Sequence, residues 1–141
     1  MAAALSEVAA RLDRELADAL EAECTLPLVW FDVLRRIDAT AEGFIALGRL
    51  AEEIVLSTGG VTRLVDRMEV AGLIERSACP TDRRSTFVKL TADGAALFAS
   101  ASAVYARRSE ELIAGVLGER RAADLERAAN ALGESLRHLG G

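Results

Sequence analysis

The sequence predicts a mostly α-helical protein with one small β-hairpin. Apolar side chains make up 51% of the 141 residues, and they recur mainly at three- and four-residue steps, the spacing of a buried helix face. Only two prolines are present to interrupt helices. Between residues 73 and 90, two short runs of β-favouring residues flank a polar loop, which predicts a hairpin instead of a helix.

The first two helices follow from the apolar periodicity. One is expected from about Ser6 to Ala22, and its apolar stripe has no partner nearby in the sequence. Pro27 suits the first position of a second helix that runs to Ile37, because the proline has no N–H to lose there. The apolar positions are Leu5, Val8, Leu12, Leu16 and Leu20 in the first helix, and Trp30, Val33, Leu34 and Ile37 in the second.

A helix-turn-helix is predicted over residues 47–68. Residues 44–46, just before it, are apolar and partly β-branched, so they can add a brief strand to the hairpin. A helix over residues 47–55 leads to a second helix, for which the Ser57 hydroxyl is a good N-cap. Four residues of the second helix follow the i, i+3, i+4, i+7 pattern and must face inward: Val61, Leu64, Val65 and Met68. The outward residues would be free to meet DNA: Thr58, Gly59, Thr62, Arg63, Asp66 and Arg67.

The hairpin is expected to project as a wing. Gly72 supplies a left-handed stop to the preceding helix, and strands are predicted at residues 73–76 and 86–90. The loop between them is too long for a two-residue turn. Arg84 near its tip suits the narrow minor groove of DNA, where negative potential is concentrated, and Asp82 is expected to hold a neighbouring guanidinium in a fixed direction.

Two amphipathic helices are expected at residues 94–117 and 120–139, joined at Gly118. Each carries more apolar surface than a small hairpin domain can cover, as does the N-terminal helix. We therefore expect all three to pack against their copies in a second subunit. The chain is predicted to be a single domain over residues 1–141. Its DNA-binding region would span about 28–91, and its dimerisation helices about 5–24 and 92–139.

The charge distribution favours DNA binding by one segment alone. The whole chain has a net charge of −5, which by itself opposes contact with a phosphate backbone. Residues 57–90, however, hold six basic residues against four acidic ones, so the rest of the chain carries the entire negative excess. Binding by such a protein should depend on a few placed arginines instead of a general basic field.

The stretch over residues 47–94 resembles the MarR family of bacterial transcription regulators. The matching motifs are Leu50-Ala51, residues 61–67, Gly72-Leu73-Ile74, Asp82-Arg83-Arg84, and Leu90-Thr91 followed by Gly94. They span about a third of the chain, and residues 26–34 also look like the family's second helix. The sequence departs from the family pattern at two places. Gly59-Gly60 stands where Ser, Thr, Ala or Pro is more usual, and Ser85 replaces the common wing glycine.

The resemblance implies a winged helix-turn-helix homodimer that regulates transcription, expected to be a repressor released by a small-molecule effector. A two-fold dimer would place its recognition helices about 34 to 36 Å apart, one turn of B-DNA, and would bind a palindromic operator in double-stranded DNA. We expect major-groove contacts from Thr58, Thr62 and Arg63; phosphate contacts from Ser57, Arg67, Lys89 and the backbone of Gly59 and Gly60; and minor-groove contacts from Arg84 with Arg83.

The control site is expected near the second helix, because the family's effector cleft lies between the DNA-binding region and the dimer helices. Trp30 is a candidate wall for a phenolic or other aromatic effector, with Phe31 and Leu26 beside it. Cys24 offers an alternative, because some family members sense peroxides with a cysteine in the N-terminal region. A lone cysteine there is more often a small packed hydrophobe.

Several other functions are not expected. The sequence holds no nucleophile constellation beyond Cys24 and His138, and no glycine-rich phosphate motif after a strand, so an enzyme is disfavoured. One histidine and two cysteines argue against a metal site, and no cofactor is expected. The absence of an apolar run of 18 residues and the acidic N-terminal segment predict a cytoplasmic protein with no membrane partner. A winged helix used only for protein contacts is the other alternative.

Overall fold

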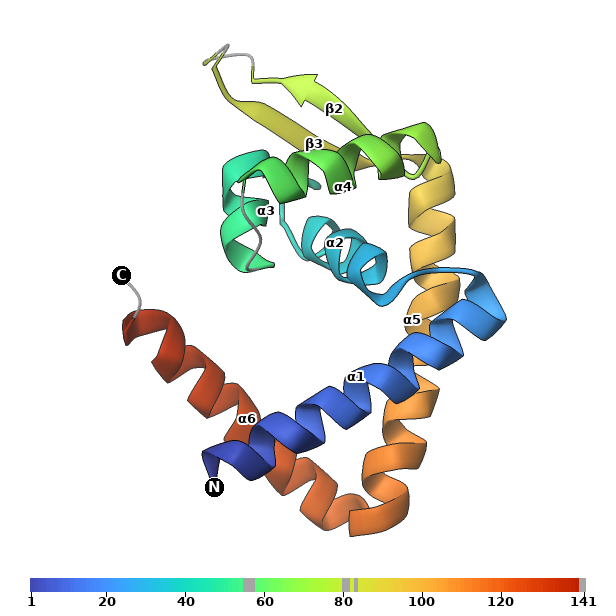
Figure 1. Ribbon diagram of the computed structural model, residues 1–141, viewed down its shortest axis with the longest axis vertical. Coiled ribbons are helices and arrows are strands. Elements are labelled where there is room, and N and C mark those ends of the chain that lie inside the picture. The colour runs from blue at the N-terminus through green and yellow to red at the C-terminus, as the bar shows by residue number, and fades with distance from the viewer. Residues whose placement is uncertain (55–57, 80–81, 83, 140–141) are drawn as a thin grey trace.

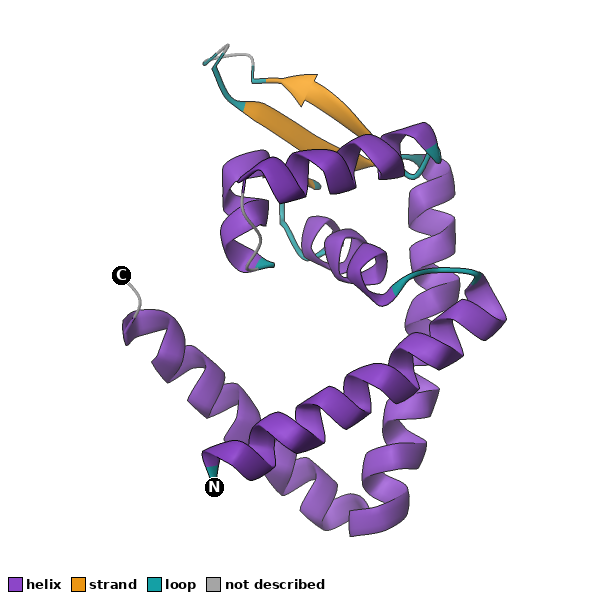
Figure 2. Ribbon diagram, in the orientation of Figure 1, coloured by secondary structure: helices purple, strands orange, loops and turns teal. Residues whose placement is uncertain are grey.

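The computed structural model describes residues 1–54, 58–79, 82 and 84–139. Its elements form two lobes (Figures 1 and 2). One lobe contains the helices α1 (Ala2–Cys24), α5 (Ala92–Leu117) and α6 (Glu119–Leu139). The other contains α2 (Leu28–Asp38), β1 (Phe44–Ala46), α3 (Leu47–Glu53), α4 (Thr58–Val70), β2 (Ile74–Ala78) and β3 (Thr86–Leu90). The helix α5 starts at the sheet and runs into the first lobe, so it joins the two (Figure 1). The predicted mostly helical fold with a small hairpin is confirmed.

The three strands form an antiparallel sheet in the order β1-β3-β2. The strand β3 pairs with β2 from Ile74↔Leu90 to Ala78↔Thr86, and with β1 around Ile45↔Val88. Ile45 and Val88 are buried, so this face of the sheet closes the core of the lobe. The brief third strand that the sequence predicted at residues 44–46 is confirmed.

The core is continuous across the two lobes. The four inward residues predicted for α4 are all buried, between 0 and 2% exposed, which confirms the helix-turn-helix pattern. Phe31 of α2 stacks on Tyr105 of α5 with ring centroids 4.8 Å apart, and it also lies against Phe98 at 5.6 Å. Aromatic pairs at these distances stabilise beyond their buried area. The helix α2 is therefore packed against α5, and its buried residues share one core with those of α4.

Several boundaries differ by a few residues from the expected ones. The helix α1 starts at Ala2 instead of Ser6, because residues 2–5 are alanines and a leucine, which are strong helix formers. Pro27 is the N-cap of α2, not its first residue. Its backbone is extended, at φ −60° and ψ 141°, and its carbonyl accepts hydrogen bonds from Trp30 and Phe31. The strand β2 continues to Ala78 because Ser77 and Ala78 pair with β3.

Gly72 ends α4 as predicted. It adopts a left-handed conformation with φ +76°. The Leu73 N–H donates to the Met68 carbonyl at 3.1 Å and the Gly72 N–H donates to the Glu69 carbonyl at 2.9 Å. These two bonds form a Schellman motif, which satisfies carbonyls at the helix end and turns the chain directly into β2.

The wing and the start of α5 meet at Leu73. Thr91 caps α5, since its Oγ1 accepts from the Gly94 N–H at 3.0 Å and donates to the Gly72 carbonyl at 2.6 Å. The Thr91 N–H donates to the Leu73 carbonyl at 3.1 Å. A Cβ atom on Gly94 would lie 1.8 Å from that carbonyl oxygen, well inside van der Waals contact. Glycine is therefore required at residue 94 for the close approach of the two segments.

We predict that Gly94→Ala destabilises the fold by about 2 to 4 kcal/mol, because the added methyl group forces Leu73 away from α5. Thermal and urea unfolding followed by circular dichroism measure the loss. Gly115→Ala in the same helix is the matched control, because nothing lies within 4 Å of its Cβ position. It should stabilise by roughly 0.5 to 1 kcal/mol through helix propensity. Equal stability of the two variants would contradict the close approach at Leu73.

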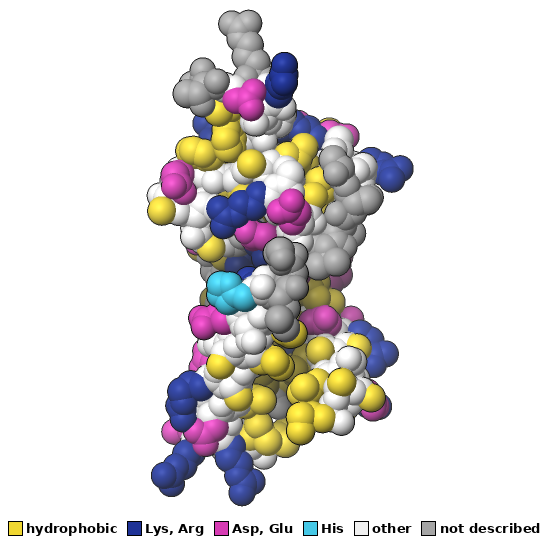
Figure 3. Space-filling view, turned by 90° about the vertical axis from the view of Figure 1, so that its left-hand side faces the viewer, with side chains coloured by type: hydrophobic (Ala, Val, Ile, Leu, Met, Phe, Trp, Pro, Cys, Tyr) yellow, Lys and Arg dark blue, Asp and Glu magenta, His cyan; other side chains and the backbone are white. Residues whose placement is uncertain are grey.

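The lobe of α1, α5 and α6 exposes apolar side chains. Figure 3 shows hydrophobic side chains gathered over this lobe, where α6 and the start of α1 lie. Leu125, Leu132 and Leu136 of α6 are 42, 50 and 57% exposed, and Leu5 and Val8 of α1 are about half exposed. Leucines at this spacing lie on one side of the helix. None of the described helices combines the length and apolarity needed to cross a membrane.

Candidate nucleic-acid interface

The helix α4 presents a polar face to solvent. Its inward residues belong to the same core as residues of α2 and α3, and the helix also contacts α3 and β2, so the opposite face is fixed by this packing. Gly59, Arg63 and Arg67 on that face are exposed, and Thr62 is half-buried. Thr58 begins the helix. The expected N-cap Ser57 and the expected wing residue Arg83 lie outside the described residues.

Ion pairs divide the basic residues of this lobe into two groups. One group consists of residues that each form an ion pair with a carboxylate: Arg35, Arg36, Arg49, Arg76 and Lys89. The side chains of Arg63, Arg67 and Arg84 have no carboxylate partner within the described part of the lobe. Unpaired guanidinium groups on a surface are available to phosphates and base edges.

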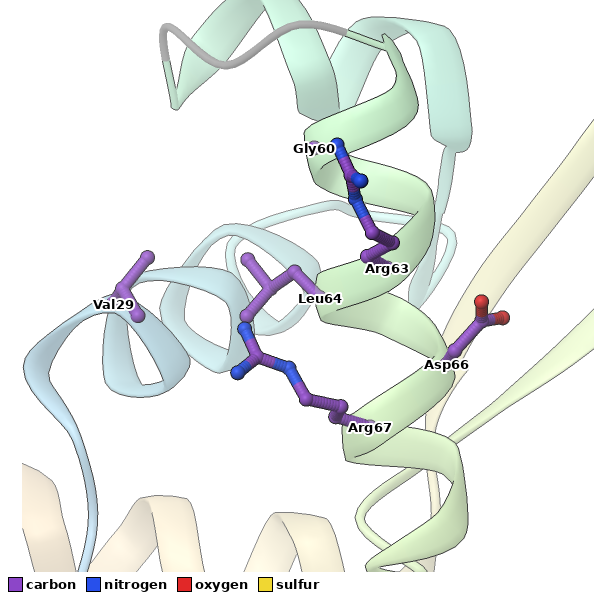
Figure 4. A pocket seen from close by; sticks show the side chains of 6 residues that line it. All are labelled: Val29, Gly60, Arg63, Leu64, Asp66 and Arg67. Carbon is purple, nitrogen blue, oxygen red and sulfur yellow. The ribbon is translucent and has the colours of Figure 1, made fainter.

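Arg63 and Arg67 line a hollow on the surface of α4 (Figure 4). The guanidinium of Arg67 extends toward the start of α2, where Val29 forms the other wall, and the guanidinium of Arg63 lies along the helix near Gly60. Asp66 also lines this hollow, but its carboxylate points toward the strands, where it forms an ion pair with Arg76. Arg63 and Arg67, which have no carboxylate partner in the described part of the lobe, flank the hollow.

Arg84 lies in the loop of the wing, two residues before β3. It lines a second hollow with Ser85 and Thr86, opposite residues 46–48 at the junction of β1 and α3. Asp82 shapes this part of the wing: its Oδ1 accepts from the Arg84 backbone N–H at 2.9 Å and its Oδ2 accepts from the Ser85 hydroxyl at 3.1 Å. The expectation that Asp82 holds a neighbouring guanidinium in place is wrong for Arg84. The Asp82 carboxylate binds the backbone N–H of Arg84 and not its guanidinium. The side chain of Arg84 is left exposed.

The role of Arg76 was not apparent from the sequence. It is one of the six basic residues in the positive segment 57–90, and its guanidinium forms ion pairs with Asp66 at 2.5 Å and Glu69 at 2.6 Å. Burial lowers the pKa of Arg76, but the hydrogen bonds and charges of the two carboxylates outweigh it, so the pKa is raised above its ordinary value. The sequence feature that could have indicated this role is the pair of acids Asp66 and Glu69, three residues apart on α4. Their contact with Arg76 depends on the turn at Gly72, which brings β2 back beside α4.

Lys89 has a local partner as well. Its Nζ lies 2.8 Å from Glu75 Oε1, across the β2–β3 pair. Both side chains are about half exposed, so the pair is weak in water and the ammonium group can exchange it for a phosphate.

The residues expected at a ligand wall are mostly core residues. Leu26 and Phe31 are 1 and 2% exposed and belong to the hydrophobic core, so they present no surface to a ligand in this arrangement. Trp30 is half-buried and packs against the core from its edge. The half-buried partner that the sequence did not indicate is Tyr105, which stacks on Phe31 and lies under Arg35. Burial raises the pKa of Tyr105, so its hydroxyl stays neutral.

The helix α1 ends at Cys24, whose side chain is half-buried against the core. Cys79 lies at the end of β2, where its backbone N–H donates to the Ser85 carbonyl at 3.2 Å. Across the described residues, no group of three His, Cys, Asp or Glu side chains is placed to hold a metal ion.

Comparisons with known proteins agree with this architecture. The model of a family described as the MarR family matches residues 25–85. The HTH-type transcriptional regulator MhqR of Bacillus subtilis (strain 168) is 37% identical over 73 residues, which cover 52% of this chain and 50% of that protein. In sequence, the chain thus spans about half the length of this relative.

Similarity to solved structures extends over nearly the whole chain. The apo form of wild-type MarR from E. coli matches with a TM-score of 0.83 and 25% identity, covering 94% of this chain and 96% of that one. The transcriptional repressor CouR, solved bound to a 23-mer DNA duplex, matches with a TM-score of 0.80 and 27% identity, covering 94 and 92%. These structural matches therefore include both lobes. The family model, in contrast, covers residues 25–85, which run from the start of α2 to the wing.

Proposed function

The chain belongs to the MarR family, and from this premise we propose that it is a sequence-specific, homodimeric DNA-binding regulator that represses transcription. The observation that carries the proposal is the set of three arginines without carboxylate partners: Arg63 and Arg67 on the recognition helix and Arg84 on the wing. An acidic chain needs such cations at the contact points, because its overall charge repels DNA.

Each proposed contact follows from its position in the lobe. Arg63, with Thr58 and Thr62, would contact base edges in the major groove, because the N-terminal half of a recognition helix enters deepest. Arg67 and Lys89 would bind phosphates on either side, and Arg84 would enter the minor groove beside the wing. Ser57, Arg83 and the backbone of Gly59 and Gly60 complete the proposed set. The absence of side chains at residues 59 and 60 supports close approach of a phosphate to the helix N-terminus.

The DNA-bound structure of CouR, which shares this fold, supports the proposal. The test is a gel-shift titration with the DNA upstream of the protein's own gene, with random DNA of equal length as the reference. We expect specific retardation at concentrations at least about a thousandfold below those needed for random DNA. Failure to retard any fragment would favour the alternative of a winged helix used for protein contacts.

We predict that Arg84→Ala weakens operator binding by about tenfold or more at physiological salt, because the wing loses its minor-groove cation. Fluorescence anisotropy with labelled operator measures the change. Arg127→Ala on α6 is the control, since it removes the same charge from an exposed helix position paired with Asp124. Unchanged affinity of the Arg84 variant would remove the wing from the binding model.

We predict that Arg63→Ala reduces the ratio of operator affinity to random-DNA affinity by about tenfold, because a base contact is lost. Arg67→Ala should weaken binding to both DNAs equally, as expected for a phosphate contact. Both are measured by anisotropy over a salt series, in which loss of a phosphate contact lowers the slope by about one. Equal losses on the two DNAs for Arg63→Ala would assign it to phosphate as well.

The exposed leucines of α6 and the apolar start of α1 support a homodimer built from these helices with α5. We predict that Leu132→Glu shifts the protein to a monomer, which sedimentation velocity detects. Ala123→Glu is the matched control. It lies nine residues earlier in α6, on the opposite side of a helix with 3.6 residues per turn. A dimer in both variants would exclude this face as the interface.

We also propose that a small phenolic or other aromatic effector controls DNA binding. The half-buried Trp30 at the edge of the core supports a site where α2 approaches the dimer helices. An effector would release DNA only if it binds one spacing of the recognition helices better than the other. Repeating the gel-shift titration with a panel of phenolic acids tests this, and repeating it with peroxide tests the alternative of redox control through Cys24.

A further inference from the structure

Arg76 connects the wing to the recognition helix through a single side chain. It lies on β2, and its guanidinium reaches across to α4. The Nη2 atom donates to Asp66 Oδ1 at 2.5 Å and to the Thr62 carbonyl at 3.3 Å, and Nη1 donates to Glu69 Oε2 at 2.6 Å. The backbone N–H of Arg76 also donates to Glu69 Oε1, at 3.2 Å.

This arrangement requires the planar fork of arginine. The three acceptors belong to residues 62, 66 and 69, which lie on one side of α4 at the i, i+4 and i+7 positions. A guanidinium presents five donors in a fixed plane and can bind them together, whereas a lysine ammonium is a single flexible point charge. The side chain of Arg76 is 23% exposed, so salt screens its ion pairs less than those of a free surface pair.

The position of the contact decides what it can control. The strand β2 is at the edge of the sheet, next to β3 alone, and it leaves α4 through the short turn at Gly72. Arg76 lies beyond that turn, in the middle of β2. Its bonds to two turns of α4 close a bridge between helix and strand, which prevents the hairpin from rotating about the turn.

We propose that Arg76 is a positioning residue that fixes the angle between the recognition helix and the wing, so that both enter the grooves of the operator together. The proposal rests on the DNA-binding function proposed above. Arg76 acts through Arg84: the guanidinium of Arg76 is engaged by α4, while that of Arg84 on the same hairpin has no described carboxylate partner. Loss of the bridge lets the wing move and reduces what Arg84 contributes to affinity.

A double-mutant cycle tests this coupling. Operator affinity is measured for the wild type, Arg84→Ala, Arg76→Lys and the double variant, with dimer mass and thermal unfolding as checks on folding. We expect Arg84→Ala to cost about tenfold in the wild type and less than about threefold in the Arg76→Lys background. The control cycle pairs Arg84→Ala with Arg108→Lys, whose partners Glu15 and Glu111 lie in the other lobe. That cycle should be additive.

A second variant distinguishes positioning from simple electrostatics. Glu69→Ala removes a negative charge near the DNA face, which by charge alone should strengthen binding. If Glu69 anchors Arg76, the variant weakens binding instead, by about threefold or more. Glu75→Ala on β2 is the matched control, because it removes an acid whose partner is Lys89, and it should strengthen binding.

The outcomes distinguish failure of the positioning role of Arg76 from failure of the proposed DNA-binding function. Coupling between Arg76 and Arg84, with weaker binding by Glu69→Ala, supports the positioning role. Additive losses, or stronger binding by Glu69→Ala, overturn it while leaving the DNA-binding function intact. A wild-type protein that binds no operator overturns both. If Arg76→Lys fails to fold, the opposite signs expected for Glu69→Ala and Glu75→Ala decide the question.

Discussion

The close approach of Leu73 to the start of α5 is the constraint on which the rest of the structure depends. Four segments meet there: the end of α4, the start of β2, the end of β3 and the first turn of α5. Gly72 turns the chain, Thr91 binds its carbonyl, and Gly94 leaves room for the carbonyl of Leu73. Because these contacts are backbone-to-backbone or through a short side chain, they leave little freedom. The end of α4, the base of the wing and the start of α5 are therefore held in one geometry, and a movement of α5 displaces the lobe that contains α4.

The placement of acidic residues explains how an acidic chain can bind DNA. Carboxylates do not simply dilute the positive charge of the lobe. They form ion pairs with particular arginines that connect two elements of the lobe. Arg36 binds Glu53 between α2 and α3, and Arg76 binds Asp66 and Glu69 between β2 and α4. The arginines on the proposed contact surface are left without such partners in the described structure. Since the net charge is unfavourable, the proposed DNA binding would depend on these few groups, and its affinity should vary steeply with each of them.

Periodicity and turn chemistry were enough to predict most of the fold. The buried face of α4, the stop at Gly72 and the strand at residues 44–46 each follow from local rules, because burial and backbone conformation act over a few residues. The candidate contacts Arg63, Arg67 and Arg84 were also identifiable, from their exposed pattern. The role of Arg76 was not, because it depends on three acceptors brought together by the fold. The burial of Phe31 was not readable from the sequence for a similar reason: its ring packs against Phe98 and Tyr105, which lie about 70 residues later in the chain.

The aromatic stack between α2 and α5 determines how a signal could reach the DNA-binding lobe. Phe31 lies against both Phe98 and Tyr105, and Arg35 lies about 6 Å above the rings of Phe31 and Tyr105 while binding Asp32. Close-packed side chains of this kind shift together or not at all, because the interior has no free volume to absorb a partial movement. A ligand that moves α5 would therefore carry α2 and the rest of the lobe with it as a rigid body, with the junction at Leu73 intact. In a two-fold dimer such a movement changes the separation of the two recognition helices directly, without any change inside either helix-turn-helix.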